Sequence, residues 1–142
     1  MIPIVIDTNV FVAAMRTNDA ASSASRAVLR AALNGQFVPL FGNALWLEYE
    51  DLLGRPVWTQ STSVDERLAV MKALAAVGRW IGIYYGWRPN LPDEGDNHLI
   101  ELAVAGNARA IVTHNVKDLR RGQLIWPGLR IVTPSECMEE FL

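Results

Sequence analysis

The sequence has little cysteine, little excess charge of either sign and no long uninterrupted apolar run. Its single cysteine, Cys137, excludes an internal disulfide framework and any zinc or iron–sulfur site that needs several cysteines. The 13 basic and 15 acidic residues give a formal net charge of -2, which argues against binding nucleic acid through bulk positive charge. The most apolar later stretch contains Lys72 and Arg79, which argues against a membrane span.

The composition predicts a folded protein with a real core. Of the 142 residues, 51% are hydrophobic and 20% are charged, which excludes disorder. The opening residues, MIPIVIDTN, lack the basic region of a signal peptide, so we expect a soluble, cytoplasmic protein. No repeat, low-complexity tract or interior linker is visible, and we expect a single domain over residues 1–142.

Short apolar runs alternate with helical patterns along the chain. Strands are expected at residues 2–6, 37–41, 110–113 and 129–132. Helices are expected at residues 10–15, 20–33, 44–53, 64–77, 96–105 and 134–140, with a short one after Asn115. Residues 79–87 allow a strand or an irregular segment. This alternation predicts an α/β fold with a mainly parallel sheet of four to five strands.

A carboxylate stands at the end of the first expected strand. Asp7 follows that strand directly and is itself followed by Thr8 and Asn9. In open α/β sheets, ligands bind outside the carboxyl ends of the strands, so Asp7 is well placed for catalysis. The alternative is that Asp7 caps the next helix, and its position alone favours neither reading.

Two further acids interrupt apolar helix faces. Glu48 shares a stripe with Leu45 and Leu52, and a carboxylate on such a face needs either a buried cationic partner or a metal ion. Asp96 begins a similar stripe, but Asp93 three residues earlier resembles a capping arrangement. Taken alone, Asp96 fits a cap better than a catalytic role.

The third expected strand also ends in polar residues. Thr113 is placed so that its hydroxyl could support a site at this edge, whereas His114 and Asn115 are better explained as structural and capping residues. Asp118 is either a site carboxylate or an exposed acid beside Lys117.

Four acids from separate elements make a sharper case than any one of them. Asp7, Glu48, Asp96 and Asp118 each lie near an element end or on an inward face. Hard divalent cations such as Mg²⁺ take oxygen ligands. A few convergent carboxylates can hold one or two such ions for phosphodiester hydrolysis.

The remaining chemistry-bearing residues give weaker signals. His98 has no partner at metal-ligand spacing and is expected to be structural or exposed. Trp46, Trp58, Trp80 and Trp87 invite a base-stacking interpretation, but core or subunit-contact roles are commoner for such residues.

The chain resembles the PIN domain family in four ordered motifs: IVIDTNVFV, LEYEDLL, DEGDNHLIELAVAGNARAIVTHNVKDL and GLRIVTPSEC. The resemblance spans residues 4 to about 141 and is closest to VapC-like toxins of toxin–antitoxin systems. It implies a three-layer α/β/α fold and a ribonuclease that depends on Mg²⁺ or Mn²⁺. Asp7, Glu48 and Asp96 match three family acids, and Asn9 matches the polar residue that supports the first.

The chain departs from the family pattern at a fourth acid. Many members carry Asp two residues after the strand threonine, where this chain has Asn115. Asp118 is the expected replacement, and Asp93 is an alternative helper. The departure leaves open whether one or two metal ions bind.

The resemblance also implies partners: an RNA substrate, a cognate antitoxin protein and a second copy of the chain. The competing hypothesis is a catalytically weakened PIN-like module that binds RNA or protein, and Asn115 is the feature in its favour. A haloacid-dehalogenase-like phosphatase would need a second Asp where Asn9 stands, and a nicotinamide-binding domain would need a GxGxxG fingerprint that is missing.

Overall fold

The computed structural model describes residues 1–16, 20–55, 58, 62–82, 97–120 and 128–142. Its strands are β1 (Ile2–Ile6), β2 (Phe37–Phe41), β3 (Arg79–Trp80), β4 (Ala110–Val112) and β5 (Arg130–Val132). Its helices are α1 (Thr8–Met15), α2 (Ala20–Leu33), α3 (Asn43–Leu52), α4 (Val64–Val77), α5 (Asn97–Ala105), α6 (Val116–Arg120) and α7 (Pro134–Phe141).

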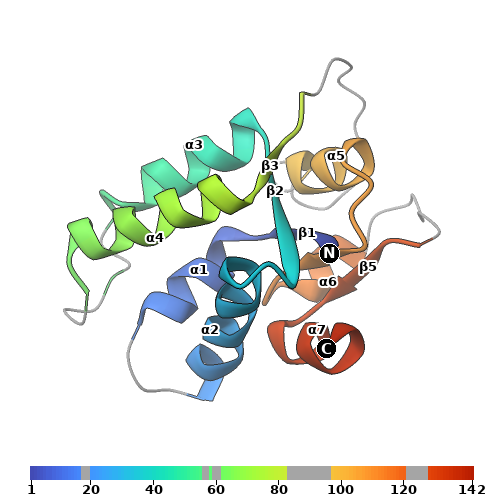
Figure 1. Cartoon of the computed structure of the whole chain (residues 1–142), viewed down its shortest axis with the longest axis horizontal. Helices are drawn as coiled ribbons and strands as arrows, with labels where there is room; N and C mark the ends of the chain where they lie inside the picture. The colour runs from blue at the N-terminus through green and yellow to red at the C-terminus, as the bar shows by residue number, and fades with distance from the viewer. Residues whose placement is uncertain (17–19, 56–57, 59–61, 83–96, 121–127) are drawn as a thin grey trace.

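The strands form one sheet in the order β3-β2-β1-β4-β5, and every neighbouring pair is parallel. The predicted α/β fold is therefore confirmed. Helices cover both sides of the sheet: Figure 1 shows α5 on one side and α2 with α7 on the other. The strands β2 and β3 are added on one side of β1, and β4 and β5 are added on the other. Because crossover connections are right-handed, crossovers that run in opposite directions along the sheet place their helices on opposite faces.

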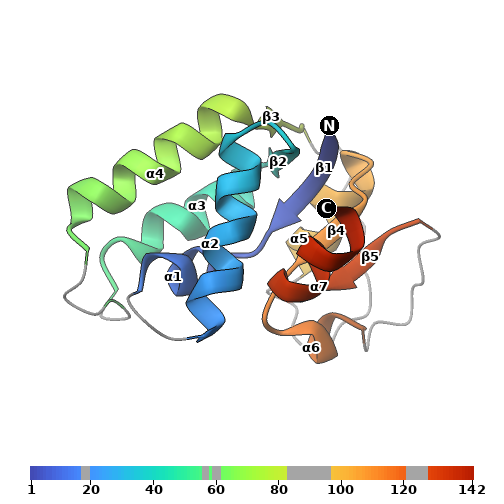
Figure 2. The same cartoon turned by 60° about the horizontal axis from the view of Figure 1, so that its bottom comes forward.

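The central strands are apolar because the sheet is covered on both faces. All five residues of β2 and all three of β4 are buried, as are Ile4, Val5 and Ile6 of β1. Continuous apolar runs of this kind are typical of parallel strands between helices. Side chains from α2, α4 and α5 complete the core, and Figure 2 shows these helices packed around β1 and β2.

Several element boundaries differ from the sequence predictions by one or two residues. The first helix begins at Thr8 because Asp7 caps it, and Thr113 leaves the third strand after Val112. Residues 79–87 contain a strand only at Arg79–Trp80, and the part from residue 83 lies outside the described residues.

The last helix begins as its sequence predicts. Pro134 occupies the first turn of α7, and Thr133 and Glu136 form a reciprocal capping box.

The single cysteine, Cys137, is buried in the core. Burial raises the pKa of its thiol to about 12, so this cysteine is a core residue rather than a reactive one.

The parallel sheet gathers the strand ends at one edge. Asp7, Gly42, Ile81, Thr113 and Thr133 each directly follow a strand, so they share the carboxyl edge. Across the described residues, no helix combines the length and the apolar character that crossing a membrane requires.

Candidate active site

Asp7 lies at the carboxyl end of β1 in the middle of the sheet, and only 7% of its surface is exposed. Its Oδ1 accepts a hydrogen bond from the Thr8 backbone N–H at 2.7 Å, and its Oδ2 accepts one from Thr113 Oγ1 at 2.8 Å. Asp7 therefore caps α1 while it also faces the sheet edge. The two readings of its position are compatible.

The environment of Asp7 opposes ionisation. Burial raises the pKa of its carboxyl above the ordinary value, and the nearby Glu48 carboxylate raises it further, while hydrogen bonds from Thr113 and Thr8 act in the other direction. The net effect is a raised pKa. A positive charge placed beside Asp7 would favour its ionised form.

Glu48 comes to the same place from α3. The Thr8 hydroxyl lies 3.0 Å from Glu48 Oε1 and 3.4 Å from Asp7 Oδ1, so one side chain touches both acids. Because a hydroxyl has a single hydrogen, Thr8 donates to one carboxylate at a time. The shorter distance favours Glu48.

The helix that carries Glu48 is anchored by Tyr49. Tyr49 is fully buried, and its hydroxyl donates to the carbonyl of Ile6 at 2.8 Å, which ties α3 to the last residue of β1. The predicted stripe holds in part: Leu45 and Leu52 are buried, whereas Glu48 is half-buried. Sequence reasoning missed Tyr49 because it is one residue away from that stripe.

His98 is the partner of Glu48. Its Nε2 lies 2.8 Å from Glu48 Oε2, and this contact is the main reason why the pKa of Glu48 is lowered. An ionised carboxylate only accepts hydrogen bonds, so Nε2 is the donor. The expectation of an exposed or purely structural His98 did not include this pairing across 50 positions of sequence.

Thr113 holds Asp7 from the neighbouring strand end. Its buried hydroxyl donates to Asp7 and accepts from Asn9 Nδ2 at 3.1 Å and from the Asn115 backbone N–H at 3.0 Å. These bonds use the single donor and both acceptor positions of a hydroxyl. Asn9 Oδ1 also accepts from the His114 backbone N–H at 3.1 Å, so Asn9 links the two strand ends.

Two predicted site residues are described, but their side chains have no contact with Asp7 or Glu48 among the described interactions. Asp118 is half-buried in α6, and no hydrogen bond or ion pair of the described residues joins it to Asp7 or Glu48. Asn115 enters through its backbone, and its side chain is exposed. Asp93 and Asp96 lie outside the described residues, so their predicted roles stay predictions.

The donors in this cluster suit a hard divalent cation in kind. Asp7 and Glu48 offer carboxylate oxygens, which Mg²⁺ and Mn²⁺ accept as ligands. Within the described ranges, no three His, Cys, Asp or Glu side chains come together as a metal site.

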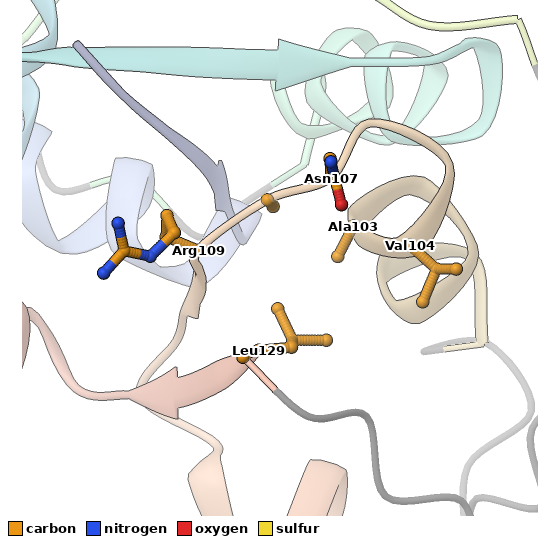
Figure 3. A pocket seen from close by; sticks show the side chains of 7 residues that line it. Ala103, Val104, Asn107, Arg109 and Leu129 are labelled. Carbon is orange, nitrogen blue, oxygen red and sulfur yellow. The ribbon is translucent and has the colours of Figure 1, made fainter.

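A cleft of about 510 Å³ adjoins the cluster on the side of β3. The cleft is lined by seven described residues, one of which, His98, belongs to the cluster; the others are Asn43, Ala44, Trp80, Ile81, Gly82 and Glu101. A smaller hollow of about 300 Å³ lies beyond the opposite ends of the strands, between α5 and β5. Figure 3 shows Arg109 and Leu129 at this second hollow, and none of its described lining residues carries a carboxylate.

The comparisons with known proteins agree with the fold. This chain superimposes with a TM-score of 0.57 on a chain from the crystal structure of VapBC2 from Rickettsia felis, which was solved bound to a DNA fragment from the VapBC2 promoter. The match covers 92% of this chain and 97% of that chain at 14% identity, so it shows a shared fold. No curated protein gives a significant sequence match.

The PIN domain family profile matches residues 3–117, which include β1 from its second residue, β2 to β4 and every contact of the Asp7–Glu48 cluster. A match over so much of the chain establishes the family. This protein belongs to the PIN domain family.

Proposed function

We propose that the protein is a metal-dependent endoribonuclease, that it acts in the cytoplasm, and that it is the toxin of a type II toxin–antitoxin system. The observation that carries the proposal is the meeting of Asp7 and Glu48 on one Thr8 hydroxyl at the carboxyl edge of the sheet. The likeness to VapBC2 supports an antitoxin as the partner that silences the enzyme.

Asp7 and Glu48 are the proposed ligands in the described residues, with Asp96 as the third and Asp118 as a weaker fourth. A divalent cation held there would supply Lewis acidity for hydrolysis of the phosphodiester. The raised pKa of Asp7 fits this role, because the carboxyl is held in a place where an added positive charge stabilises its ionised form.

The other residues of the cluster position these two acids. Thr113 donates to Asp7 at 2.8 Å and is itself held by Asn9 at 3.1 Å, and His98 holds Glu48 at 2.8 Å. The buried Cys137, whose thiol has a pKa of about 12, does not offer a nucleophile. The protein then contributes fixed geometry and electrostatic stabilisation rather than a covalent intermediate.

The test is cleavage of single-stranded RNA by the purified protein with Mg²⁺, with Mn²⁺ and with excess chelator. The proposal expects cleavage with either cation, none with chelator, and recovery when Mg²⁺ is added back. A cognate antitoxin isolated in complex with the chain should suppress the cleavage. Activity that persists in excess chelator contradicts the metal-dependent mechanism.

A weakened PIN module that binds RNA without cutting it is the second candidate. The exposed amide of Asn115, at the position where many family members carry a fourth acid, favours it. RNA binding without cleavage at any Mg²⁺ or Mn²⁺ concentration would select this alternative.

A further inference from the structure

Trp80 is a large aromatic side chain that the core does not cover. It is the last residue of β3, and 48% of its surface is exposed. The proposed ribonuclease function leaves it without a role. Its surroundings nevertheless hold it firmly.

Two aromatic rings support Trp80 from the protein side. The Phe41 ring stacks on it with centroids 5.6 Å apart and an interplanar angle of 30°, and the Trp46 ring meets it edge-on at 5.4 Å. Phe41 is buried, so one side of the indole rests on the core. An aromatic ring that is already held in place loses little conformational freedom when a second flat ring stacks on it.

The space beside Trp80 is polar rather than wholly apolar. Trp80 lines the 510 Å³ cleft together with three polar residues, Asn43, His98 and Glu101. Asn43 is exposed at the start of α3, and Glu101 is half-buried on α5. An aromatic plane with hydrogen-bonding side chains around it matches a nucleobase, which has two flat faces and polar edges.

The cleft borders the proposed catalytic cluster at His98. His98 lines it and also lies 2.8 Å from Glu48. Trp80 and Asp7 both lie at the carboxyl edge, on strands separated only by β2, so their strand axes are about 10 Å apart. A strand of RNA with its phosphate at Asp7 and Glu48 can therefore place a neighbouring base over Trp80.

We propose that Trp80 forms a stacking platform for one unpaired nucleobase of the RNA, next to the nucleotide that is cut. The inference rests on the proposed ribonuclease function and adds a base-binding subsite to it. The negative charge of the domain makes such a subsite useful, because stacking provides affinity that does not depend on basic side chains.

The experiment is a double-mutant cycle between protein and RNA. Asp7→Asn protein, which is expected to bind without cutting, is titrated by fluorescence anisotropy with a labelled single-stranded RNA of mixed sequence in Mg²⁺. Matched RNAs each lack one base. One abasic position should weaken binding by roughly 5- to 100-fold, the range expected for one stacked base. Trp80→Ala should weaken binding to the full RNA equally and abolish the effect of that abasic position.

Conservative variants separate stacking from simple apolar contact. Trp80→Phe should keep most of the affinity, whereas Trp80→Leu should behave like Trp80→Ala. Leu47→Ala is the matched surface control, since Leu47 is 62% exposed on α3 and does not line the cleft. Thermal unfolding of each variant identifies any affinity loss that comes from loosened packing against Phe41 and Trp46.

The outcomes are distinct. Equal binding by Trp80→Leu and Trp80→Phe, or independent effects of Trp80→Ala and every abasic position, overturns the subsite and favours a protein contact at this patch. Cleavage by the unmodified protein is measured in parallel. If the protein cleaves RNA but Trp80→Ala and the abasic positions act independently, the subsite is wrong and the ribonuclease proposal stands. If Trp80→Ala abolishes the effect of one abasic position but the unmodified protein does not cleave, the ribonuclease proposal is wrong and the subsite stands.

Discussion

The two edges of the sheet are built from different chemistry. At the carboxyl edge, Asp7 and Thr113 follow strands and enter a network with Glu48 and His98. At the amino edge, the chain enters β2 and β4 through turns that need left-handed backbone, at Gly35 (φ +83) and Asn107 (φ 58).

The difference follows from the direction of the strands. A chain that leaves a parallel strand begins a helix, whose first N–H groups need oxygen acceptors, so Asp7 and Thr133 stand there as caps. A chain that leaves a helix before a strand needs a tight stop, which favours Gly and Asn. Polar oxygen atoms therefore collect at the carboxyl edge, where a few of them also meet one another.

The sharpest test of this contrast is Asp7→Asn. We expect RNA cleavage to fall by about 10³-fold or more, because losing a ligand carboxylate removes several kcal/mol of transition-state stabilisation. Folding without metal should be unaffected or improved, since a buried charge close to Glu48 is removed. Cleavage rates and urea unfolding measure the two effects.

Two matched variants show whether the loss is specific. Asp51→Asn, at an exposed acid of α3 that pairs with Arg55, should leave cleavage unchanged. Asp118→Asn should reduce cleavage by less than Asp7→Asn. Complete loss from Asp118→Asn would instead make Asp118 a main ligand, and undiminished cleavage by Asp7→Asn would defeat the mechanism.

His98→Ala should have the next largest effect. Removing the group that orients a ligand typically costs about 10- to 100-fold in metal affinity or activity. His98→Gln, whose amide can donate to Glu48, should recover part of the loss. Isothermal titration with Mn²⁺ reads the effect directly, and equal Mn²⁺ affinity in all three proteins would mean that His98 only packs α5.

Glycines at the amino edge should affect stability and leave the chemistry alone. A Cβ at Gly78, just before β3, would lie 2.6 Å from the Pro39 carbonyl oxygen and 3.0 Å from the Leu74 carbonyl oxygen. Because backbone atoms cannot step aside, Gly78→Ala should lower the free energy of unfolding by about 1–3 kcal/mol.

Gly35→Ala is the comparison for that variant. Nothing lies within 4 Å of a Cβ there, so its cost comes from the positive φ alone and is about 1 kcal/mol. Chemical denaturation gives both values, and cleavage per folded molecule should match the parent. A selective loss of cleavage in either variant would break the division between the edges.

The smallest effect concerns pH and the cap of α7. A hydrogen bond from the Thr133 backbone N–H holds the pKa of Glu136 below its ordinary value of 4.5. Stabilisation from a lowered carboxyl pKa is fully present above 4.5 and is lost as the pH falls through the folded value. The Glu136→Gln variant keeps the capping geometry without the charge. In acid, the melting temperature of the unmodified protein should therefore fall slightly toward that of the variant. A difference in melting temperature between the two proteins that stays constant from pH 3 to 6, roughly the range around this pKa, would contradict the prediction.

Much of the fold was predictable from local patterns. Apolar runs at residues 2–6 and 37–41 predict strands buried on both faces, and the structure has β1 and β2 at the same residues. The two-residue strand β3 was not separable from an irregular segment, because Arg79 and Trp80 are both exposed and carry no burial pattern.

The sequence by itself determined which carboxylates stand at element ends and on apolar faces, because caps and periodicity act over a few residues. Only the tertiary structure decided which side chains meet. Thr8 touches Glu48 across 40 positions, His98 reaches it across 50, and Thr113 reaches Asp7 across 106. These pairings depend on the order of the strands and on how α3 and α5 pack against them. Local sequence carries the preference of each residue for an environment, but the packing of distant elements determines its partners.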